Sequence, residues 1–182
     1  MSSRDEGPGA RLDGPSHIAL VGLSGSGKST VAPLLAARTG LGACIDLDRE
    51  IEQTAGRAVQ QVFEIDGEPA FRRLESAALA DALAGAPCVI ATGGGAVLDP
   101  VNRSLLRTGA RVVWLRATPT NLAARLTDTD ESRPLLSGDA EFALRRLADE
   151  REALYSEVAE LVIDVDGIGA AAVADEVARM LE

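Results

Sequence analysis

A glycine-rich segment at residues 22–29 limits the possible folds of this chain more than any other part of its sequence. It reads Gly-Leu-Ser-Gly-Ser-Gly-Lys-Ser and fits the pattern G-x-x-x-x-G-K-[ST]. The apolar run at residues 17–21 predicts a strand before it, and apolar spacing from Ser29 to Thr39 predicts a helix after it, which stops at Gly40. A strand, such a loop and a helix in this order are typical of a site for nucleotide phosphates.

The residue types of this loop each suit one part of a nucleotide tail. The glycines let backbone N–H groups point at the β-phosphate, Lys28 neutralises β- and γ-phosphate oxygens, and Ser29 offers a hydroxyl to Mg²⁺. A glycine-rich turn with an incidental lysine is the alternative. The loop alone does not name the acceptor, because ATPases, GTPases and kinases share it. We expect ATP and Mg²⁺ as cofactors, with nucleotide contacts from Gly25, Ser26, Gly27, Lys28, Ser29 and Thr30.

Strand and helix patterns alternate along the rest of the chain. Repeated β-α order implies a parallel sheet covered by helices, so we expect the α/β class with a three-layer α/β/α fold and a five-stranded parallel sheet. Helical segments are expected between Arg49 and Ala84, and a C-terminal helix shows one apolar face. That face consists of Val173, Val177, Met180 and Leu181. The expected strands are residues 17–21, 43–47, 88–92, 111–115 and 161–164.

The length of 182 residues suits one domain and is too short for two independent catalytic domains. Residues 1–16 combine glycines, prolines and charges without apolar periodicity, so we expect a disordered leader there. Residues 17–182 are then a single domain.

The net charge of −10 argues against a nucleic-acid partner, because the sequence has no basic stripe to offset it. An anionic small molecule remains open, since charges beyond about 8 Å are largely screened and a few arginines in a cleft reverse the local sign.

The two cysteines, Cys44 and Cys88, are isolated beside apolar residues and predict buried, reduced thiols. The chain shows neither an export signal nor an apolar run of the roughly 20 residues that a membrane span needs. We therefore expect a cytoplasmic monomer without a membrane partner. His17 and Trp114 are expected to be structural.

Asp46 and Asp48 lie two residues apart at the end of a predicted strand. Both carboxylates then point to one face, at the edge where open α/β sheets bind ligands. One of them can hold Mg²⁺ through water while the other meets an acceptor hydroxyl. The alternative is that Asp48 is the N-cap of the following helix.

Two further segments have both a structural and a functional interpretation. Arg72 and Glu75 are neighbours at i, i+3 of a helix, which by itself predicts a surface ion pair. The run Gly93, Gly94 and Gly95 follows a strand and lets the backbone approach a ligand closely, although a bare turn would also use glycines.

Six blocks in order and spacing resemble the shikimate kinase family, and the similarity runs from about His17 to the C-terminus. Together they are more specific than any one block. They are Gly-Leu-Ser-Gly-Ser-Gly-Lys-Ser-Thr, Asp46-Leu47-Asp48 with Ile51-Glu52, Gly67-Glu68 with Phe71-Arg72 and Glu75, Gly93-Gly94-Gly95, Arg133-Pro134-Leu135-Leu136, and Arg151 with Leu154-Tyr155. Ala153 departs from the pattern, because a proline is common there.

The resemblance implies ATP-dependent phosphorylation of the 3-hydroxyl of shikimate, a step toward chorismate and the aromatic amino acids. It also implies a nucleoside-monophosphate-kinase-like P-loop kinase fold. Lys28, Asp48 and Arg133 would be catalytic, and Ser29 and Asp46 would hold Mg²⁺, the latter through water. The shikimate pocket would be lined by Asp48, Arg72, Gly94, Gly95 and Arg151.

The resemblance also implies a substrate-binding segment, a lid and a contact to adenine. Residues 47–77 would be a substrate-binding segment, and residues 127–139 a lid that carries Arg133 to the transferring phosphate. A solvated loop is the alternative to the lid. Arg125 would bind the nucleotide by stacking on adenine, opposite the loop around Asp166 and Gly167.

Two other functions remain open from the sequence. One is a related kinase for gluconate, a nucleotide or another cyclitol, because the nucleotide half would look alike. The presence of Arg72, Arg151 and Asp48 favours a polyhydroxy carboxylate. The other is a catalytically silent binding module, which would be expected to lack Lys28 or one of these three residues.

Overall fold

The computed structural model describes residues 17–127 and 140–182. Within these ranges the strands form one parallel sheet in the order β2-β3-β1-β4-β5. They are β1 (His17–Val21), β2 (Cys44–Asp46), β3 (Val89–Ala91), β4 (Ala110–Arg116) and β5 (Leu161–Asp164). The predicted α/β class and five-stranded parallel sheet are confirmed, and the predicted leader, residues 1–16, lies outside the described residues.

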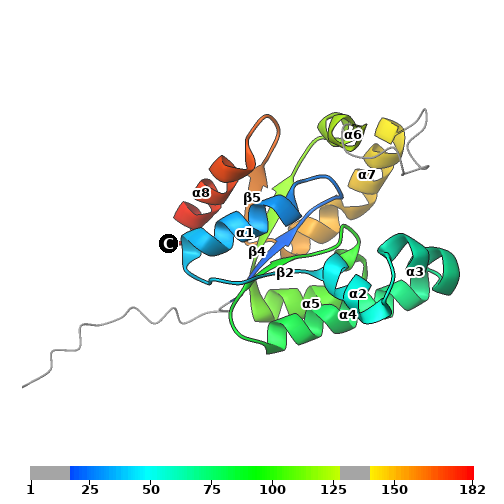
Figure 1. The fold of residues 1–182 in the computed structure, drawn as a ribbon. Coiled ribbons are helices and arrows are strands. Elements are labelled where there is room, and N and C mark those ends of the chain that lie inside the picture. Colours follow the sequence, from blue (N-terminus) through cyan, green and yellow to red (C-terminus); the bar gives the residue numbers. More distant parts are fainter. Residues whose placement is uncertain (1–16, 128–139) are drawn as a thin grey trace, which may run out of the picture.

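Helices follow the strands and cover both faces of the sheet (Figure 1). Helix α1 begins at Lys28, one residue before the predicted start, and ends before Gly40 as expected. The helices are α1 (Lys28–Thr39), α2 (Leu47–Ala55), α3 (Val59–Asp66), α4 (Glu68–Ala84), α5 (Pro100–Gly109), α6 (Pro119–Thr127), α7 (Ala140–Val158) and α8 (Ala170–Leu181), with a short 3₁₀ turn η1 (Ala96–Leu98).

Alternate side chains of the strands enter two separate cores, because successive residues of a strand point to opposite faces. In β1, Ile18 and Leu20 pack under α1 and α8, while Ala19 and Val21 face the side covered by α4, α5 and α7. Figure 1 shows α1 and α8 side by side on their face of the sheet. The predicted three-layer arrangement is therefore present.

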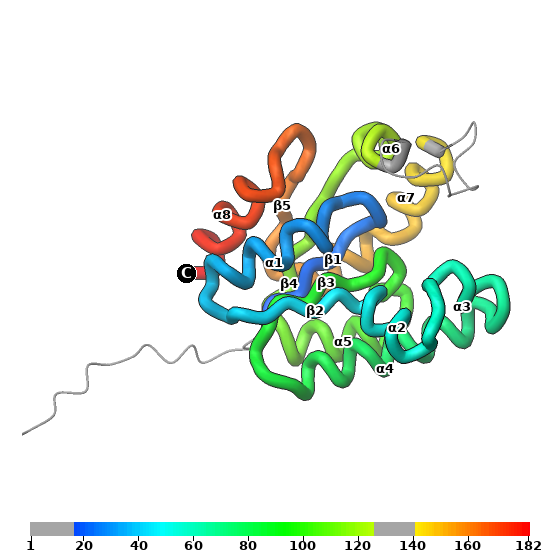
Figure 2. Tube along the Cα trace, viewed as in Figure 1, coloured from blue at the N-terminus to red at the C-terminus, as the bar shows by residue number. Residues whose placement is uncertain are grey.

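Helices α2, α3 and α4 share a small core of their own at one end of the molecule (Figure 2). Its buried members are Ile51, Val62 and Phe71. The range 47–77, predicted as a substrate-binding segment, contains α2, α3 and the first part of α4. All three buried members of the small core lie within this range, while Leu47 belongs to the core on the sheet.

One burial prediction was wrong, and the apolar face predicted for the C-terminal helix is not buried throughout. Cys88 is buried as expected, but Cys44 is exposed, because it begins β2 at the edge of the sheet, where the strand has a neighbour on one side only. Met180 is 40% exposed, since the buried face of α8 is centred nearer Ala174 and leaves Met180 at its margin. In the described part of the chain, no helix is both long enough and apolar enough to span a membrane.

Candidate active site

The loop between β1 and α1 presents an uncovered helix N-terminus. Gly27 precedes α1 with a φ of 95°, a conformation that side-chain-bearing residues rarely adopt, and it supplies no capping side chain. The first turn of α1 contains no acidic residue. The Thr30 amide donates to the Gly27 carbonyl at 3.0 Å, whereas the amides of Lys28 and Ser29 donate to no residue in the described ranges. These two amides and the positive end of the helix are therefore available to an anion, as the sequence pattern predicts.

Lys28 is folded back onto this loop. Its side chain is buried, and Nζ donates to the carbonyls of Gly22 at 2.7 Å and Leu23 at 2.9 Å. Burial lowers the pKa of Lys28 to about 8, although the carboxylates of Asp48 and Asp46 oppose this by attraction. Both carboxylates therefore lie within electrostatic reach of the ammonium group. The prediction that both lie at the end of a strand was wrong for Asp48, because β2 ends at Asp46 and Asp48 belongs to the first turn of α2.

The two aspartates differ in their local roles. Asp46 is the N-cap of α2, because its Oδ1 accepts the backbone N–H of Asp48 at 3.1 Å. The sequence alternative, an N-cap at Asp48, assigned the wrong residue. The Asp48 carboxylate lies over the glycine turn instead, with Oδ1 3.2 Å from where a β-carbon on Gly93 would stand.

The glycine turn after β3, Gly93 to Gly95, touches the phosphate loop. A β-carbon on Gly94 would lie 3.0 Å from the backbone nitrogen of Ser24. A β-carbon on Gly95 would overlap the Arg72 guanidinium, at 2.5 Å from Nη2. Glycines are needed here because neighbouring groups occupy the space of a side chain, so the turn is more than a bare connection.

Arg72 reaches the turn from α4 as part of a buried ion pair. Its Nη1 is 2.7 Å from Oε2 of Glu75, whose side chain is 1% exposed, and its Nη2 is 3.1 Å from Oε1 of the exposed Glu68. Burial raises the pKa of Glu75, and Arg72 opposes that rise. The predicted i, i+3 pair is present, but it lies inside the site rather than on the surface.

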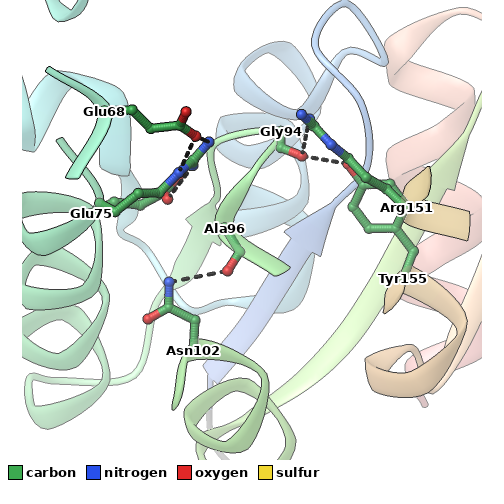
Figure 3. Close-up of polar contacts among 8 residues, drawn as sticks. Glu68, Glu75, Gly94, Ala96, Asn102, Arg151 and Tyr155 are labelled. Carbon is green, nitrogen blue, oxygen red and sulfur yellow. Dashed lines mark hydrogen bonds and ion pairs between the residues drawn. The ribbon is translucent and has the colours of Figure 1, made fainter. Parts of the chain in front are cut away.

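Arg151 approaches the same turn from the opposite side (Figure 3). Its Nη1 donates to the carbonyl oxygen of Gly94 at 3.0 Å, and the hydroxyl of Tyr155 donates to the same oxygen at 2.5 Å. Arg151 and Tyr155 are four residues apart on α7 and so lie on one face of that helix. The structure therefore brings both predicted pocket arginines to one glycine turn, beside the phosphate loop.

Arg125, from α6, links two loops. Its Nη2 donates to the carbonyl of Val165 at 2.7 Å, and its Nη1 is 3.4 Å from the carbonyl of Gly25. It thus lies beside the loop of Asp166 and Gly167, as predicted, while adenine stacking stays a prediction. Residues 128–139 of the predicted lid, with Arg133, lie outside the described residues.

Two side chains of this site had no assigned role in the sequence interpretation. Glu75 and Tyr155 both occur in the motif blocks, but neither was given a function. The spacing of Tyr155 four residues after Arg151 was the available signal, because it places the two side chains on one helix face. No comparable signal marks the burial of Glu75, which depends on how α4 packs against Gly93: Glu75 Oε1 occupies the space of a Gly93 side chain.

Comparisons with known proteins find relatives that belong to one family. The family model described as shikimate kinase matches residues 24–182. A shikimate kinase from Moorella thermoacetica is 43% identical over 168 residues, which cover 92% of this chain and 95% of that protein. The chain belongs to the shikimate kinase family. A shikimate kinase from Bordetella pertussis is 46% identical over 158 residues, covering 86% of this chain and 74% of the relative.

A solved structure supports the family assignment at the level of the fold. The shikimate kinase from Acinetobacter baumannii, in complex with shikimate, aligns with a TM-score of 0.85 and 36% identity. The alignment covers 93% of each chain. The P-loop kinase fold and the family resemblance inferred from the motif blocks are therefore confirmed.

Proposed function

We propose that this chain transfers the γ-phosphate of ATP to the 3-hydroxyl of shikimate. The observation that carries the proposal is the convergence of two arginines on one glycine turn next to the phosphate loop. Arg72 lies against Gly95, Arg151 donates to Gly94, and Gly94 is in close contact with the backbone of Ser24. Family membership and the shikimate complex of the A. baumannii relative support shikimate as the substrate.

The two arginines suit the carboxylate of the acceptor. A guanidinium presents planar, paired N–H donors that fit a carboxylate bidentately, whereas a lysine offers a single charge. Shikimate has one carboxylate and three hydroxyls, so arginines that bind the carboxylate and a carboxylate that accepts from a hydroxyl match its two kinds of polar group. Asp48 and Glu75 both lie against Gly93, but Glu75 is already paired with Arg72, so Asp48 is the carboxylate proposed to meet a hydroxyl.

Asp48 is proposed to orient the acceptor hydroxyl. Phosphoryl transfer has a largely dissociative transition state, so alignment and charge neutralisation matter more than a strong base. Asp48 accepts a hydrogen bond from the hydroxyl in this role. Its position beside Gly93, within electrostatic reach of Lys28, supports this assignment.

The nucleotide side is proposed to use Lys28 with the first residues of α1. Ser29 and Thr30 are exposed at the N-terminus of α1. Arg125 is proposed as the adenine contact, and Arg133 as a ligand of the transferring phosphate. When ATP binds, Lys28 exchanges its bonds to the Gly22 and Leu23 carbonyls for phosphate oxygens, whose negative charge favours the ammonium form.

The donor set fits magnesium rather than a metal held by protein alone. Among the described residues, no group of three or more His, Cys, Asp or Glu side chains is placed to hold a metal. The hydroxyl of Ser29 and, through water, the carboxylate of Asp46 would hold the ion, and so few protein ligands suit Mg²⁺, which keeps several waters. Bound there, Mg²⁺ would neutralise charge on the β- and γ-phosphates.

A coupled ADP-release assay tests the function. With Mg-ATP, we expect kcat/KM for shikimate to exceed that for gluconate and for AMP by at least about a hundredfold. NMR of the product should place the phosphate on the 3-hydroxyl. Lys28→Ala should lower kcat by roughly 10²–10³-fold or more, since the lysine acts on charge in the transition state. Equal turnover of gluconate would point to the related sugar-acid kinase instead.

A further inference from the structure

We propose that Tyr155 is a positioning residue of this site. Its hydroxyl holds the Gly94 carbonyl, which fixes the Gly94–Gly95 peptide and lets Arg151 turn toward an anionic substrate. This inference rests on the proposed function, because the anion in question is the carboxylate of the acceptor. It adds a residue that contacts neither nucleotide nor acceptor but sets the position of groups that do.

The hydrogen-bond geometry gives Gly94 two donors of different kinds. The Tyr155 hydroxyl donates at 2.5 Å and Arg151 Nη1 at 3.0 Å, both to the same carbonyl oxygen (Figure 3). A carbonyl oxygen has two lone pairs and can accept both. The hydrogen bond from the neutral donor, Tyr155, is the shorter of the two, so the carbonyl does not depend on the arginine alone.

Packing fixes the Tyr155 hydroxyl in place. The residue is 1% exposed, and its ring stacks on Trp114 of β4 with ring centroids 5.5 Å apart. Trp114 is itself buried at 7% exposure. Burial raises the pKa of Tyr155 to about 12, so the hydroxyl keeps its proton and remains a donor at neutral pH. The phenol is therefore a rigid donor anchored on the sheet.

Holding the carbonyl also orients an amide. The N–H of a trans peptide points away from its carbonyl, so the N–H of Gly95 is directed away from the Gly94 oxygen and thus away from α7. Within the described ranges, this amide donates to no other residue. An oriented, unused N–H beside Arg72 is a donor for the acceptor molecule, and its direction is set by Tyr155 from the other side of the peptide.

Arg151 has a second task that competes with the carbonyl. Its Nε is buried and has no hydrogen-bond partner in the described part of the chain, so its guanidinium is only partly used. A carboxylate that arrives at the turn draws the guanidinium toward it. With Tyr155 in place the Gly94 carbonyl stays paired during this movement, whereas without the hydroxyl the carbonyl would lose its remaining donor.

Removing the hydroxyl alone tests the inference. Tyr155→Phe keeps the ring and the stack on Trp114. We expect it to raise the shikimate KM and the shikimate dissociation constant about tenfold, to leave the ATP KM within about twofold, and to lower kcat much less than the shikimate affinity. A merely structural role would instead lower the unfolding temperature without separating the two KM values.

Thr92→Val is the matched control. It removes another buried hydroxyl that donates to a backbone carbonyl, that of Leu20 at 3.0 Å. We expect a loss of stability and a change in shikimate KM of less than about twofold. If the two variants raised the shikimate KM equally, or if Tyr155→Phe left it unchanged, the positioning role would be wrong.

A measurement on the unaltered fold covers the case in which the variant folds poorly. Tyr155 is the single tyrosine of the chain, so growth with fluorotyrosine labels this site alone. Saturating shikimate should shift its ¹⁹F resonance more than Mg-ADP does, and an unmoved resonance would contradict the inference. If the unaltered protein turned over no shikimate at all, the proposed function would be at fault instead.

Discussion

Arg72 arrives at the glycine turn with its charge already balanced by Glu75 and Glu68. It also lies over the ring of Phe71, with 5.3 Å between the guanidinium carbon and the ring centroid. These contacts hold the guanidinium group in one orientation before any ligand binds, and a pre-organised group loses less entropy on binding. The sequence motif alone named this arginine, while its orientation comes from packing.

Arg72→Lys tests whether shikimate binding needs the paired donors of the guanidinium group. A lysine keeps the charge but cannot span two carboxylate oxygens, so we expect the shikimate KM to rise roughly ten- to hundredfold, as for loss of a charged hydrogen bond of about 1.5–3 kcal/mol. The ATP KM should change little, and steady-state kinetics with each substrate varied separates the two. Arg73→Lys, at the exposed neighbouring position, is the control. If only the ATP KM moved, Arg72 would belong to the nucleotide side.

Glu75 predicts a pH dependence of stability. Its folded-state pKa lies above the ordinary value of 4.5 because the carboxyl is buried, so the folded chain holds this proton more tightly than the unfolded chain does. The contribution of Glu75 to the free energy of unfolding is therefore full below pH 4.5 and is lost as the pH rises through the folded pKa. Glu75→Gln should become progressively more stable relative to the unmodified protein over that rise.

Urea unfolding of both proteins at several pH values from 4.5 up to about 8 measures this difference. Glu68→Gln is the control, because it removes the other partner of the same arginine, whose side chain is 60% exposed. A constant difference between Glu75→Gln and the unmodified chain across this range would mean that Glu75 is not destabilised by burial as a carboxylate.

At the scale of elements, the strand-loop-helix order was predictable because each unit carries its own signal. The strands are short apolar runs, and glycines at Gly40, Gly56 and Gly67 end α1, α2 and α3 with positive φ. Edge position was not predictable from such local signals. Cys44 therefore looked like a buried thiol, although β2 lies at the border of the sheet.

The separate core of α2, α3 and α4 makes a prediction about this segment. Val62 is fully buried in one cluster with Ile51 and Phe71, so Val62→Ala should lower the free energy of unfolding by about 2 kcal/mol through lost burial and a small cavity. Val101→Ala, on α5 at 60% exposure, should change it by less than about 0.5 kcal/mol. Urea unfolding measures both.

If Val62→Ala lowered the free energy of unfolding as little as Val101→Ala, the small core would contribute little to the stability of this segment. If the shikimate KM rose with the loss of stability, the packing of α3 would also support the position of Arg72, because Phe63 of α3 stacks on Phe71 with ring centroids 4.3 Å apart.

For the molecule as a whole, the net charge of −10 conceals a site built around arginines and one lysine. Composition argued against a nucleic-acid partner but could not show where the cations converge, because Arg72 and Arg151 are far apart in sequence and meet only through the sheet topology. The order of the motifs indicated this convergence only through the resemblance to a family. The structure shows it directly, at the carboxyl ends of β1 and β3.

Ligand binding should stabilise the entire domain. A non-hydrolysable ATP analogue with Mg²⁺, at about a hundred times its dissociation constant, should raise the free energy of unfolding by about 2.7 kcal/mol. For a domain of this size that corresponds to roughly 5–10 °C in the unfolding temperature. Differential scanning calorimetry measures the shift. Chelation of the metal should reduce it, and Lys28→Ala should nearly abolish it, whereas an equal shift in Lys28→Ala would place the nucleotide elsewhere.

The stack of Trp114 on Tyr155 gives the chain an optical reporter. Trp114 is the only indole in the sequence, and its burial shifts emission toward shorter wavelengths than in water. Its ring stacks on that of Tyr155, whose hydroxyl donates to the Gly94 carbonyl, and the Arg116 guanidinium carbon lies 5.6 Å from the Trp114 ring centroid. A titration followed by intrinsic fluorescence would therefore sense events at the turn without any added dye.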